Sequence, residues 1–260
     1  IEADVYALVN SDIEVTENWL APILELFDKN EKVAIIQPKI LDFKDKGYFE
    51  YAGAGGGFID RFGYPFCRGR IFDSIEKDNG QYDDVKKIFW ASGACFFIRK
   101  NVFRELEGFD ADFFAHQEEI DLCWRAKNLG YKVMYCGAST IYHVGGGTLN
   151  AESPFKTYLN FRNNHYLIKK NMPAAKANFL IPFRFCLDLL ALIKFALDGK
   201  WGNAMAISKA HRHVVKALLT KKIKYNKDVS QKPNLAGIYT NSIVWRYFAK
   251  GKKKFSDLNF

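Results

Sequence analysis

The sequence lacks the cysteine pairs of a disulfide framework or a zinc site. Its five cysteines are scattered, odd in number and form no C-x-x-C pair: Cys67, Cys95, Cys123, Cys136 and Cys186. The pattern argues against both kinds of cross-link and fits a reducing cytosol. No secretory signal peptide is visible either, and the chain opens on Ile1 in what looks like the run-up to a strand. We expect the natural N-terminus to lie upstream.

Nucleotide-loop signatures and long apolar runs are missing too. The glycines at 53–57 match neither a P-loop nor a G-x-G-x-x-G that opens a helix. The most apolar segment, FLIPFRFCLDLLALIKFALDG at 179–199, is interrupted by Arg184, Asp188 and Lys194. These charges make it a poor membrane span. Wholesale disorder is excluded, because 48% of the residues are hydrophobic and 26% are charged.

Acidic side chains are scarce after residue 150. Residues 1–150 hold 17 Lys and Arg against 24 Asp and Glu, a net charge of −7, and residues 151–260 hold 21 against 5, a net charge of +16, which together give +9. An acidic front joined to a basic back indicates two tasks on one chain, with an anionic partner for the basic part. No recognised nucleic-acid motif accompanies the charge, so a membrane surface is the favoured partner and nucleic acid is not expected.

What the sequence does contain is an alternation typical of α/β proteins. A β-prone run at 3–9, a helical pattern from about 18 and a strand at 33–40 predict a parallel α/β unit. The Gly-rich stretch at 52–70 predicts loop and hairpin, and 87–100 predicts a buried strand. A helix begins near 118 and ends at Gly130, followed by two short strands at 131–136 and 139–144. From 155 onward the pattern is helical and basic.

The polar group Asn10-Ser11-Asp12 ends the first predicted strand, with Glu14 close behind. Open α/β sheets bind ligands at this edge, where a short carboxylate can hold a hard divalent cation that clamps a diphosphate. The alternative is an Asx turn that caps the next helix, because Asn and Asp are ordinary turn residues. The residues alone favour the turn slightly.

Three carboxylates gather at the start of the helix near 118: Glu118, Glu119 and Asp121. The helix dipole stabilises acids in a first turn, and Asp121 can pair with Arg125 one turn later. That structural account leaves Glu119 pointing elsewhere. A carboxylate near others has a raised pKa, which suits a general base. The two interpretations are equally weighted on the residues alone.

His143 ends the last predicted strand and precedes Gly145-Gly146-Gly147. The glycines would let the chain fold closely over a ligand. A lone histidine is more often a packed or surface residue than a ligand, although imidazole is a common one. Metal ligation by His143 is therefore the less favoured alternative at this point.

The basic region predicts two amphipathic helices, at 179–199 and about 203–221. In the first, Arg184, Asp188 and Lys194 fall on one stripe and leave a wide apolar arc. The second separates a basic side from an apolar side (Lys209, Arg212, His213 and Lys216 against Ala206, Ile207, Ala210, Val214 and Leu218). Both patterns favour helices lying in a membrane interface. The alternative is a helical hairpin packed on the rest of the protein.

The order of the segments is more specific than any one of them. LVNSDIEV, WASGACFFIRKNVF, GFDADFFAHQEEIDLCWRAKNLGYKVMYC, TIYHVGGGT and YLNFRNNHYLIKKN together resemble the family-2 glycosyltransferases with a GT-A fold. The likeness is greatest to rhamnosyltransferase-like members of bacterial surface-polysaccharide pathways and covers about residues 1–172. It implies a Rossmann-like mixed sheet. Family members begin with a nucleoside-binding half that this sequence does not contain.

The resemblance also implies roles for individual residues. Asp12 stands where the family's DXD variant binds a divalent metal, Mg²⁺ or Mn²⁺, and His143 resembles a metal or diphosphate contact. Glu118-Glu119 replaces the usual Glu-Asp pair, so Glu119 inherits the role of base, with Glu118 shaping the local field. A further set is placed on the substrate side: Trp90, Ser92, Gly93 and Asp121.

The predicted protein is an inverting, metal-dependent glycosyltransferase. Residues 1–172 form the catalytic part, 173–225 the amphipathic helices and 226–260 a basic tail. The donor is a nucleotide sugar, the likeness suggests rhamnose as the sugar, and the acceptor is lipid-linked or a saccharide. The enzyme is expected in the cytoplasm, peripheral on the inner face of the membrane. Alternatives are a non-catalytic membrane-associated scaffold and, less favoured, a metal-dependent nucleotide-sugar hydrolase.

Overall fold

The computed structural model describes residues 2–145, 153–224 and 236–260, which form two compact units. The first, here called the sheet unit, comprises Ile1–Gly108, Leu122–Gly145 and Asn234–Phe260. The second, the helical unit, comprises Phe109–Asp121 and Gly146–Pro233. Each unit is described by itself.

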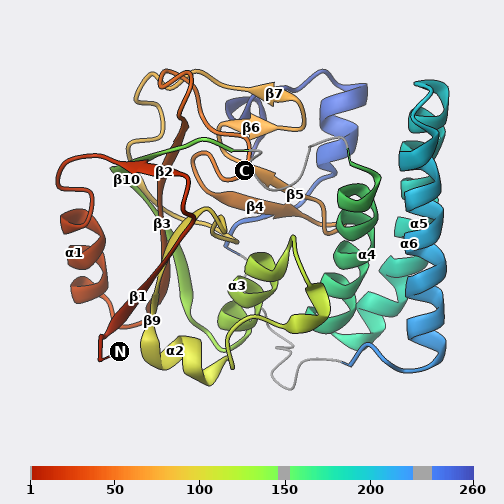
Figure 1. Ribbon diagram of the computed structural model, residues 1–260, viewed down its shortest axis with the longest axis horizontal. Coiled ribbons are helices and arrows are strands. Elements are labelled where there is room, and N and C mark those ends of the chain that lie inside the picture. The colour runs from red at the N-terminus through yellow and green to blue at the C-terminus, as the bar shows by residue number, and fades with distance from the viewer. Residues whose placement is uncertain (1, 146–152, 225–235) are drawn as a thin grey trace. The chain divides into compact units, whose positions relative to one another are not determined.

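The sheet unit is built on a mixed sheet (Figure 1). Its strand order is β1 (Val5–Val9), β9 (Cys95–Arg99), β3 (Val33–Asp42), β10 (Lys132–His143) and β2 (Ile13–Val15), and β8 (Val85–Lys87) also pairs with β10. β3 and β10 are parallel, whereas β9 runs antiparallel to both β1 and β3. The predicted α/β class with a mixed sheet is confirmed. β1 and β3 run in the same direction, but β9 lies between them. The two strands of the predicted parallel α/β unit are therefore not hydrogen-bonded to each other.

The core of this sheet follows from its apolar runs. β3 is buried at every position but its last, as expected for a central strand covered on both faces. Helix α1 (Ala21–Lys29) buries Ile23 and Phe27 against Ile36 and Phe97. Helix α2 (Lys100–Glu105) follows β9 directly.

The two strands predicted at 131–136 and 139–144 are one strand, β10, so that boundary was wrong. Its pairing with β3 shifts register between Cys136 and Thr140. Gly137 lies in this shift, and a Cβ there would come within 2.4 Å of the carbonyl oxygen of Tyr82. The chain therefore bulges where it passes close to another backbone segment, but it continues as one strand. In the sequence this bulge interrupts the apolar pattern, so it predicts two strands instead of one.

A second, smaller sheet comes from the Gly-rich stretch. Its order is β11 (Ile238–Tyr239), β4 (Gly57–Asp60), β5 (Pro65–Cys67), β6 (Arg70–Ile71) and β7 (Ser74–Ile75), which confirms the predicted hairpin. Over its described residues, 236–260, the segment predicted as a basic tail is part of this sheet's fold. It forms β11, the π-helix η2 (Trp245–Ala249) and the short helix η3 (Phe255–Asp257). Phe255 and Phe260 pack against Phe58 and Phe66. These aromatic contacts hold the segment on the sheet although it is rich in lysine.

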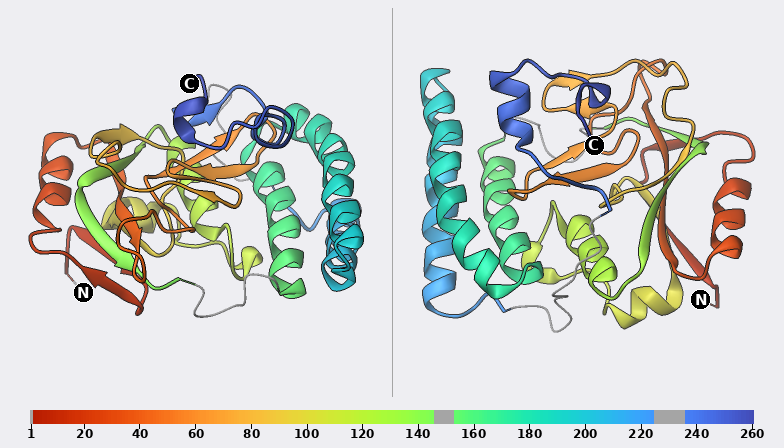
Figure 2. Two further views of the ribbon diagram at one scale, coloured as in Figure 1. Left: turned by 90° about the horizontal axis from the view of Figure 1, so that it is seen from above. Right: turned by 180° about the vertical axis from the view of Figure 1, so that it is seen from behind.

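The helical unit contains η1 (Ala111–Phe113), the first turn of α3 (Glu118–Asn128), and the helices α4 (Pro154–Asn171), α5 (Ala174–Leu197) and α6 (Trp201–Leu219). The last three helices lie side by side in both views of Figure 2. The apolar and basic sides of α6 separate as predicted, and Lys209, Arg212 and Lys216 are exposed. The apolar side does not face outward toward a membrane: Ala206, Ile207, Ala210 and Val214 are buried, and Ala206 and Ala210 pack with Tyr158 and Leu159 of α4, as in the packed-hairpin alternative.

The three charged residues predicted to form one stripe on α5 differ in their exposure to solvent. Arg184 and Asp188 are buried, whereas Lys194 is exposed. Asp188 lies at the centre of a polar clasp: its Oδ2 is 2.9 Å from Nε2 of His165 on α4 and 3.3 Å from Nε2 of His211 on α6, and Arg184 Nη2 is 3.3 Å from its Oδ1. These contacts give each buried charge a partner and join all three helices. None of the helices in the described residues is long and apolar enough to cross a membrane.

Candidate active site

The sheet unit brings Asp12 and His143 together, as the sequence predicted for two metal ligands. β2 pairs with β10 in a register that sets His143 opposite Ile13, directly after Asp12. His143 Nε2 lies 3.3 Å from Asp12 Oδ1 and 3.4 Å from Asn10 Nδ2. The imidazole is buried, while the Asp12 side chain is about one-third exposed (34%). The donor pair therefore faces solvent through its carboxylate.

The alternative reading of Asp12 as a helix cap is ruled out by the structure. Strand β2 stands between Asp12 and the next helix, and α1 is preceded by Leu20 with no side-chain cap. Glu14, close behind Asp12 in the sequence, pairs with Lys46 at 2.5 Å. Gly145 follows His143 with a φ of +64°, a left-handed conformation that suits glycine. Gly146 and Gly147 lie outside the described residues.

Glu50 is a member of this cluster that the sequence did not indicate. It is buried at 3% exposure, and its Oε1 lies 3.5 Å from His143 Nδ1. Its Oε2 accepts a hydrogen bond from the backbone N–H of Ala52 at 2.5 Å. Glu50 lies in a loop without a motif, so no local signal could have revealed it. Glu50 lies at one nitrogen of the His143 ring, and the other nitrogen faces Asp12. In metal sites, a carboxylate placed in this way behind a histidine orients the histidine as a ligand.

The cluster fits a divalent cation by its donor set. A carboxylate oxygen and an imidazole nitrogen 3.3 Å apart can bind the same ion, and both suit Mn²⁺, with carboxylate also suiting Mg²⁺. Burial opposes protonation of His143, but Glu50 and Asp12 outweigh it and raise the pKa of the imidazole. The two carboxylates therefore favour a positive charge at the imidazole between them, and either a proton or a bound cation can supply that charge.

The helical unit holds Glu118 and Glu119 in the first turn of α3, as predicted. Burial and the neighbouring Glu118 carboxylate raise the pKa of Glu119 to about 8, against the opposing effect of backbone N–H groups at the helix start. Burial likewise raises the pKa of Glu118, whose Oε2 is buried without a hydrogen-bond partner among the described residues. A carboxyl group with a pKa near neutrality can take up and release a proton, which is what a general base requires.

The segment before these carboxylates is strained. Phe114, His116 and Gln117 all have φ between +65° and +71°, a region that costs about 1 kcal/mol or more for a residue other than glycine. Such strain persists only where other contacts enforce it.

Helix α4 supplies those contacts. Asn163, fully buried, donates from Nδ2 to the carbonyl oxygens of Phe113, Ala115 and His116 at 3.0, 2.8 and 2.7 Å. Its neighbour Arg162 donates from Nη2 to the carbonyl of Phe113 at 2.7 Å. Both residues lie in the segment YLNFRNNHYLIKKN, but the sequence gave no reason to connect them with residues nearly fifty positions earlier. The α4 pair therefore clamps the loop that presents Glu118 and Glu119.

The residues predicted on the substrate side lie mostly inside their units. The Trp90 ring is buried and donates from Nε1 to the carbonyl of Phe58 at 2.8 Å. Ser92 is buried, and its hydroxyl bonds to the carbonyl of Ala52, whereas Gly93 is exposed. Asp121 is buried and accepts from Nδ2 of Asn171 at 2.7 Å. Their roles toward a substrate remain predictions.

Comparison with known proteins identifies the class. Residues 7–168 match the glycosyl transferase family group 2, and the chain belongs to that family. The predicted family is thereby confirmed. The matched range contains Asp12, Glu50, Glu118, Glu119, His143 and Asn163.

Individual relatives are distant. The chain is 26% identical over 160 residues to the low-salt glycan biosynthesis hexosyltransferase Agl10 of Haloferax volcanii, covering 60% of this chain and 48% of the relative. It is 29% identical over 58 residues to the N-acetylglucosaminyl-diphospho-decaprenol L-rhamnosyltransferase of Mycobacterium tuberculosis, covering 22% and 19%. A solved structure, GalNAc-T7 with UDP, GalNAc and Mn²⁺, superposes with a TM-score of 0.48 at 15% identity, over 84% of this chain and 41% of the other. The chain thus spans about half or less of these relatives.

Proposed function

We propose that the protein transfers a sugar from a nucleotide sugar to an acceptor hydroxyl with inversion at the anomeric carbon, and that Glu119 is the base. The observation that carries the proposal is Glu119 itself: a carboxyl group with a pKa near 8, at the end of a loop that helix α4 holds in a strained conformation. Family membership supplies the reaction class.

In the proposed reaction Glu119 accepts the proton of the acceptor hydroxyl. The hydroxyl oxygen forms a bond to the anomeric carbon on the face opposite the leaving group, and the bond from that carbon to the diphosphate oxygen breaks. Asp12 and His143 would hold Mg²⁺ or Mn²⁺, and the ion, when bound, would supply positive charge that stabilises the departing nucleoside diphosphate. Gly93, with the neighbouring Trp90 and Ser92, and Asp121 are assigned to the acceptor side.

The test is the substitution Glu119→Gln, which keeps the shape of the side chain and removes the base. Transfer to acceptor should be lost, while the Mn²⁺-dependent binding of the nucleotide sugar, measured by calorimetry, should persist. Asp12→Asn serves as the matched variant, since it should lose the metal-dependent binding itself. Wild-type turnover in Glu119→Gln would overturn the assignment. Consumption of donor without acceptor would instead identify a hydrolase.

We also propose that α5 binds the cytoplasmic membrane face, where a lipid-linked acceptor for surface-polysaccharide synthesis would lie. The outward side of α5 is apolar along about 27 Å, while the buried side carries Arg184 and Asp188, an inversion of the usual pattern. The exposed members include Phe179 (80%), Leu190 (61%) and Leu197 (82%). Exposed cations at the helix ends and on α6 suit anionic lipid: Lys176, Lys194, Lys209, Arg212 and Lys216.

Flotation with vesicles of mixed neutral and anionic lipid tests this contact. The pair Leu190→Asp and Ile193→Asp should abolish flotation, whereas Leu24→Asp, at an exposed leucine of α1, should leave it unchanged. Equal flotation of all variants, or none by the wild type, would contradict the proposal. A chain that floats but binds neither nucleotide sugar nor metal would support the scaffold alternative. Rhamnose as the transferred sugar is tested by offering the protein different nucleotide sugars.

A further inference from the structure

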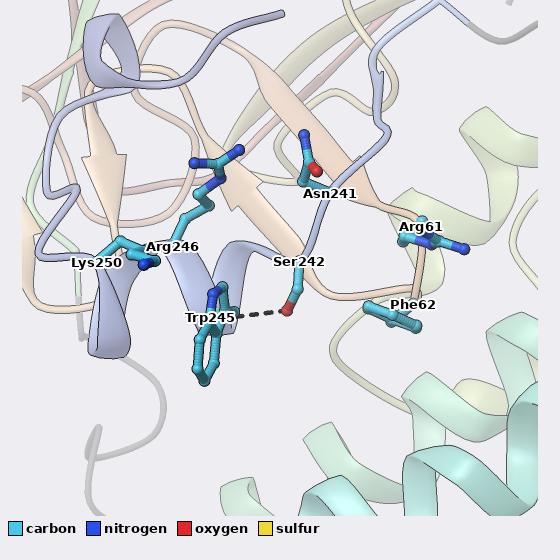
Figure 3. Close-up of a pocket in the computed structure, with 7 residues that line it drawn as sticks. All are labelled: Arg61, Phe62, Asn241, Ser242, Trp245, Arg246 and Lys250. Carbon is cyan, nitrogen blue, oxygen red and sulfur yellow. Dashed lines mark hydrogen bonds between the residues drawn. The ribbon is translucent and has the colours of Figure 1, made fainter.

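We propose that a pocket between the β4–β5 turn and the C-terminal segment of the sheet unit binds an anionic saccharide, a sugar that carries a phosphate, diphosphate or carboxylate group. The pocket has a volume of about 430 Å³ and contains none of the residues of the Asp12–His143 cluster. Seven residues line it (Figure 3): Arg61, Phe62, Asn241, Ser242, Trp245, Arg246 and Lys250. As a subsite for the acceptor, this inference rests on the proposed function.

The two walls of the pocket are held together by one buried carboxylate. Asp60, 1% exposed, accepts through Oδ1 from the backbone N–H groups of Phe62 and Tyr64, both at 2.9 Å. Its Oδ2 accepts from the backbone N–H of Ile243 at 3.0 Å, on the opposite wall. Because these bonds join segments 183 positions apart, the pocket is preformed and does not depend on a ligand for its shape.

The wall that carries Trp245 is a π-helix, a form that is rare and is frequent at functional sites. It is anchored by Tyr247, whose hydroxyl lies 2.9 Å from Ser74 Oγ and whose ring packs on Phe72. The anchoring leaves Trp245 60% exposed at the pocket. An indole presented to solvent by a fixed backbone offers a flat apolar face of the kind on which a sugar ring can pack.

The polar side of the pocket is cationic. Arg61, Arg246 and Lys250 line it, and none of the three has a carboxylate partner among the described residues. Figure 3 shows Arg246 and Lys250 on one side of Trp245 and Arg61 on the other. The buried Asp60 carboxylate lies behind this surface, with both oxygens bonded to backbone N–H groups. Three uncompensated cations in one concavity create a field that attracts anions, and arginine binds phosphate or carboxylate with two parallel hydrogen bonds.

The combination defines the ligand class. A neutral glycan would leave the three cations unused, and a simple anion would leave Trp245 unused. A sugar with an attached anionic group uses both. Two sources share this chemistry: the sugar diphosphate head of a lipid-linked acceptor and an acidic sugar within a polymer.

The experiment measures binding to the whole chain by calorimetry, with N-acetylglucosamine 1-phosphate, a tri-galacturonate, inorganic phosphate and neutral maltotriose as probes. At least one of the two anionic saccharides should bind, with an affinity that falls as salt increases. Maltotriose and phosphate should bind at least tenfold more weakly. Preference between the sugar phosphate and the uronate assigns the source.

Two variants test the site. The pair Arg246→Ala and Lys250→Ala should weaken the binding of the anionic saccharide at least tenfold, and so should Trp245→Ala. Lys253→Ala, which removes an exposed charge outside the pocket, is the matched control and should bind as the wild type does. Equal binding by all variants, absence of binding by either anionic saccharide, or phosphate binding as tight as sugar phosphate would overturn the proposal. Glu119→Gln should retain this binding, so failure here is distinguishable from failure of the catalytic assignment.

Discussion

Glu119 provides the sharpest prediction, because its pKa of about 8 affects stability and activity in opposite directions. The folded pKa lies above the usual value of 4.5, so the folded protein binds this proton more tightly than the unfolded chain does. The resulting stabilisation is fully present below about pH 4.5 and is lost as the pH rises through 8. A shift of this size corresponds to about 5 kcal/mol.

Glu119→Gln removes the ionisable proton and therefore removes this pH dependence. We expect the variant and the wild type to have similar free energies of unfolding at pH 4. Above pH 8 the variant should be the more stable of the two, by a difference approaching about 5 kcal/mol. Urea unfolding at a series of pH values measures the difference directly.

The activity of the wild type should change in the other direction. Because the base must be ionised, only about one-tenth of the enzyme is competent at pH 7, and kcat/KM should rise nearly tenfold per pH unit up to about pH 7 and level off above about pH 8. Glu118→Gln is the control that tests the cause. Burial is the larger cause of the raised pKa of Glu119 and the Glu118 charge the second, so this variant should retain transfer while its rate profile moves part of the way to lower pH. A stability difference between wild type and Glu119→Gln that does not vary with pH, or a rate profile unmoved by Glu118→Gln, would refute the reasoning.

Three further predictions follow from contacts within each unit. Asn163→Ala removes three hydrogen bonds to the loop before Glu118 and should lower kcat roughly 100-fold with the KM for donor unchanged, since small misplacements of a catalytic group are costly; a raised donor KM with normal kcat would contradict it. Glu50→Gln should weaken Mn²⁺ binding roughly 10- to 100-fold, measured by electron paramagnetic resonance titration, and unchanged affinity would exclude an orienting role. Asp188→Asn should destabilise the protein by roughly 3–5 kcal/mol in urea unfolding near neutral pH, because it removes the charge shared by the buried His165 and Arg184 and the partly buried His211; a loss below 1 kcal/mol would show that the clasp is dispensable.

Much of the fold could be predicted because the relevant signals are local. The apolar run of β3, the hairpin in the Gly-rich stretch and the helix α3, which ends at Asn128 just before Gly130, each depend on neighbouring residues. What the sequence could not show is which strands pair. β9 lies between β1 and β3, and nothing in the spacing of the three segments requires that order. The same holds for α5, whose apolar arc was visible but whose inward side was not.

The candidate site divides in the same way. Asp12 and His143 were identified by residue type and position at strand ends, and Glu119 by its neighbours. Glu50 and Asn163 were not identified, because each acts on residues far away in the chain through contacts that only the folded structure creates. The residues proposed to perform chemistry thus left a signal in the sequence, whereas the residues proposed to position them did not.

The distribution of strain strengthens the assignment of Glu119. Three left-handed residues, two carboxylic acids with raised pKa values and a buried carboxylate oxygen without a partner among the described residues all fall within 114–119. Each of these features is unfavourable for folding. If Asn163 served stability alone, it could form the same hydrogen bonds to a loop without strain. Instead, its side-chain amide donates hydrogen bonds to three carbonyl groups of the strained segment. A helix residue that holds an unfavourable loop in one conformation is expected where that conformation presents a reacting group, and the group presented here is the carboxylate pair.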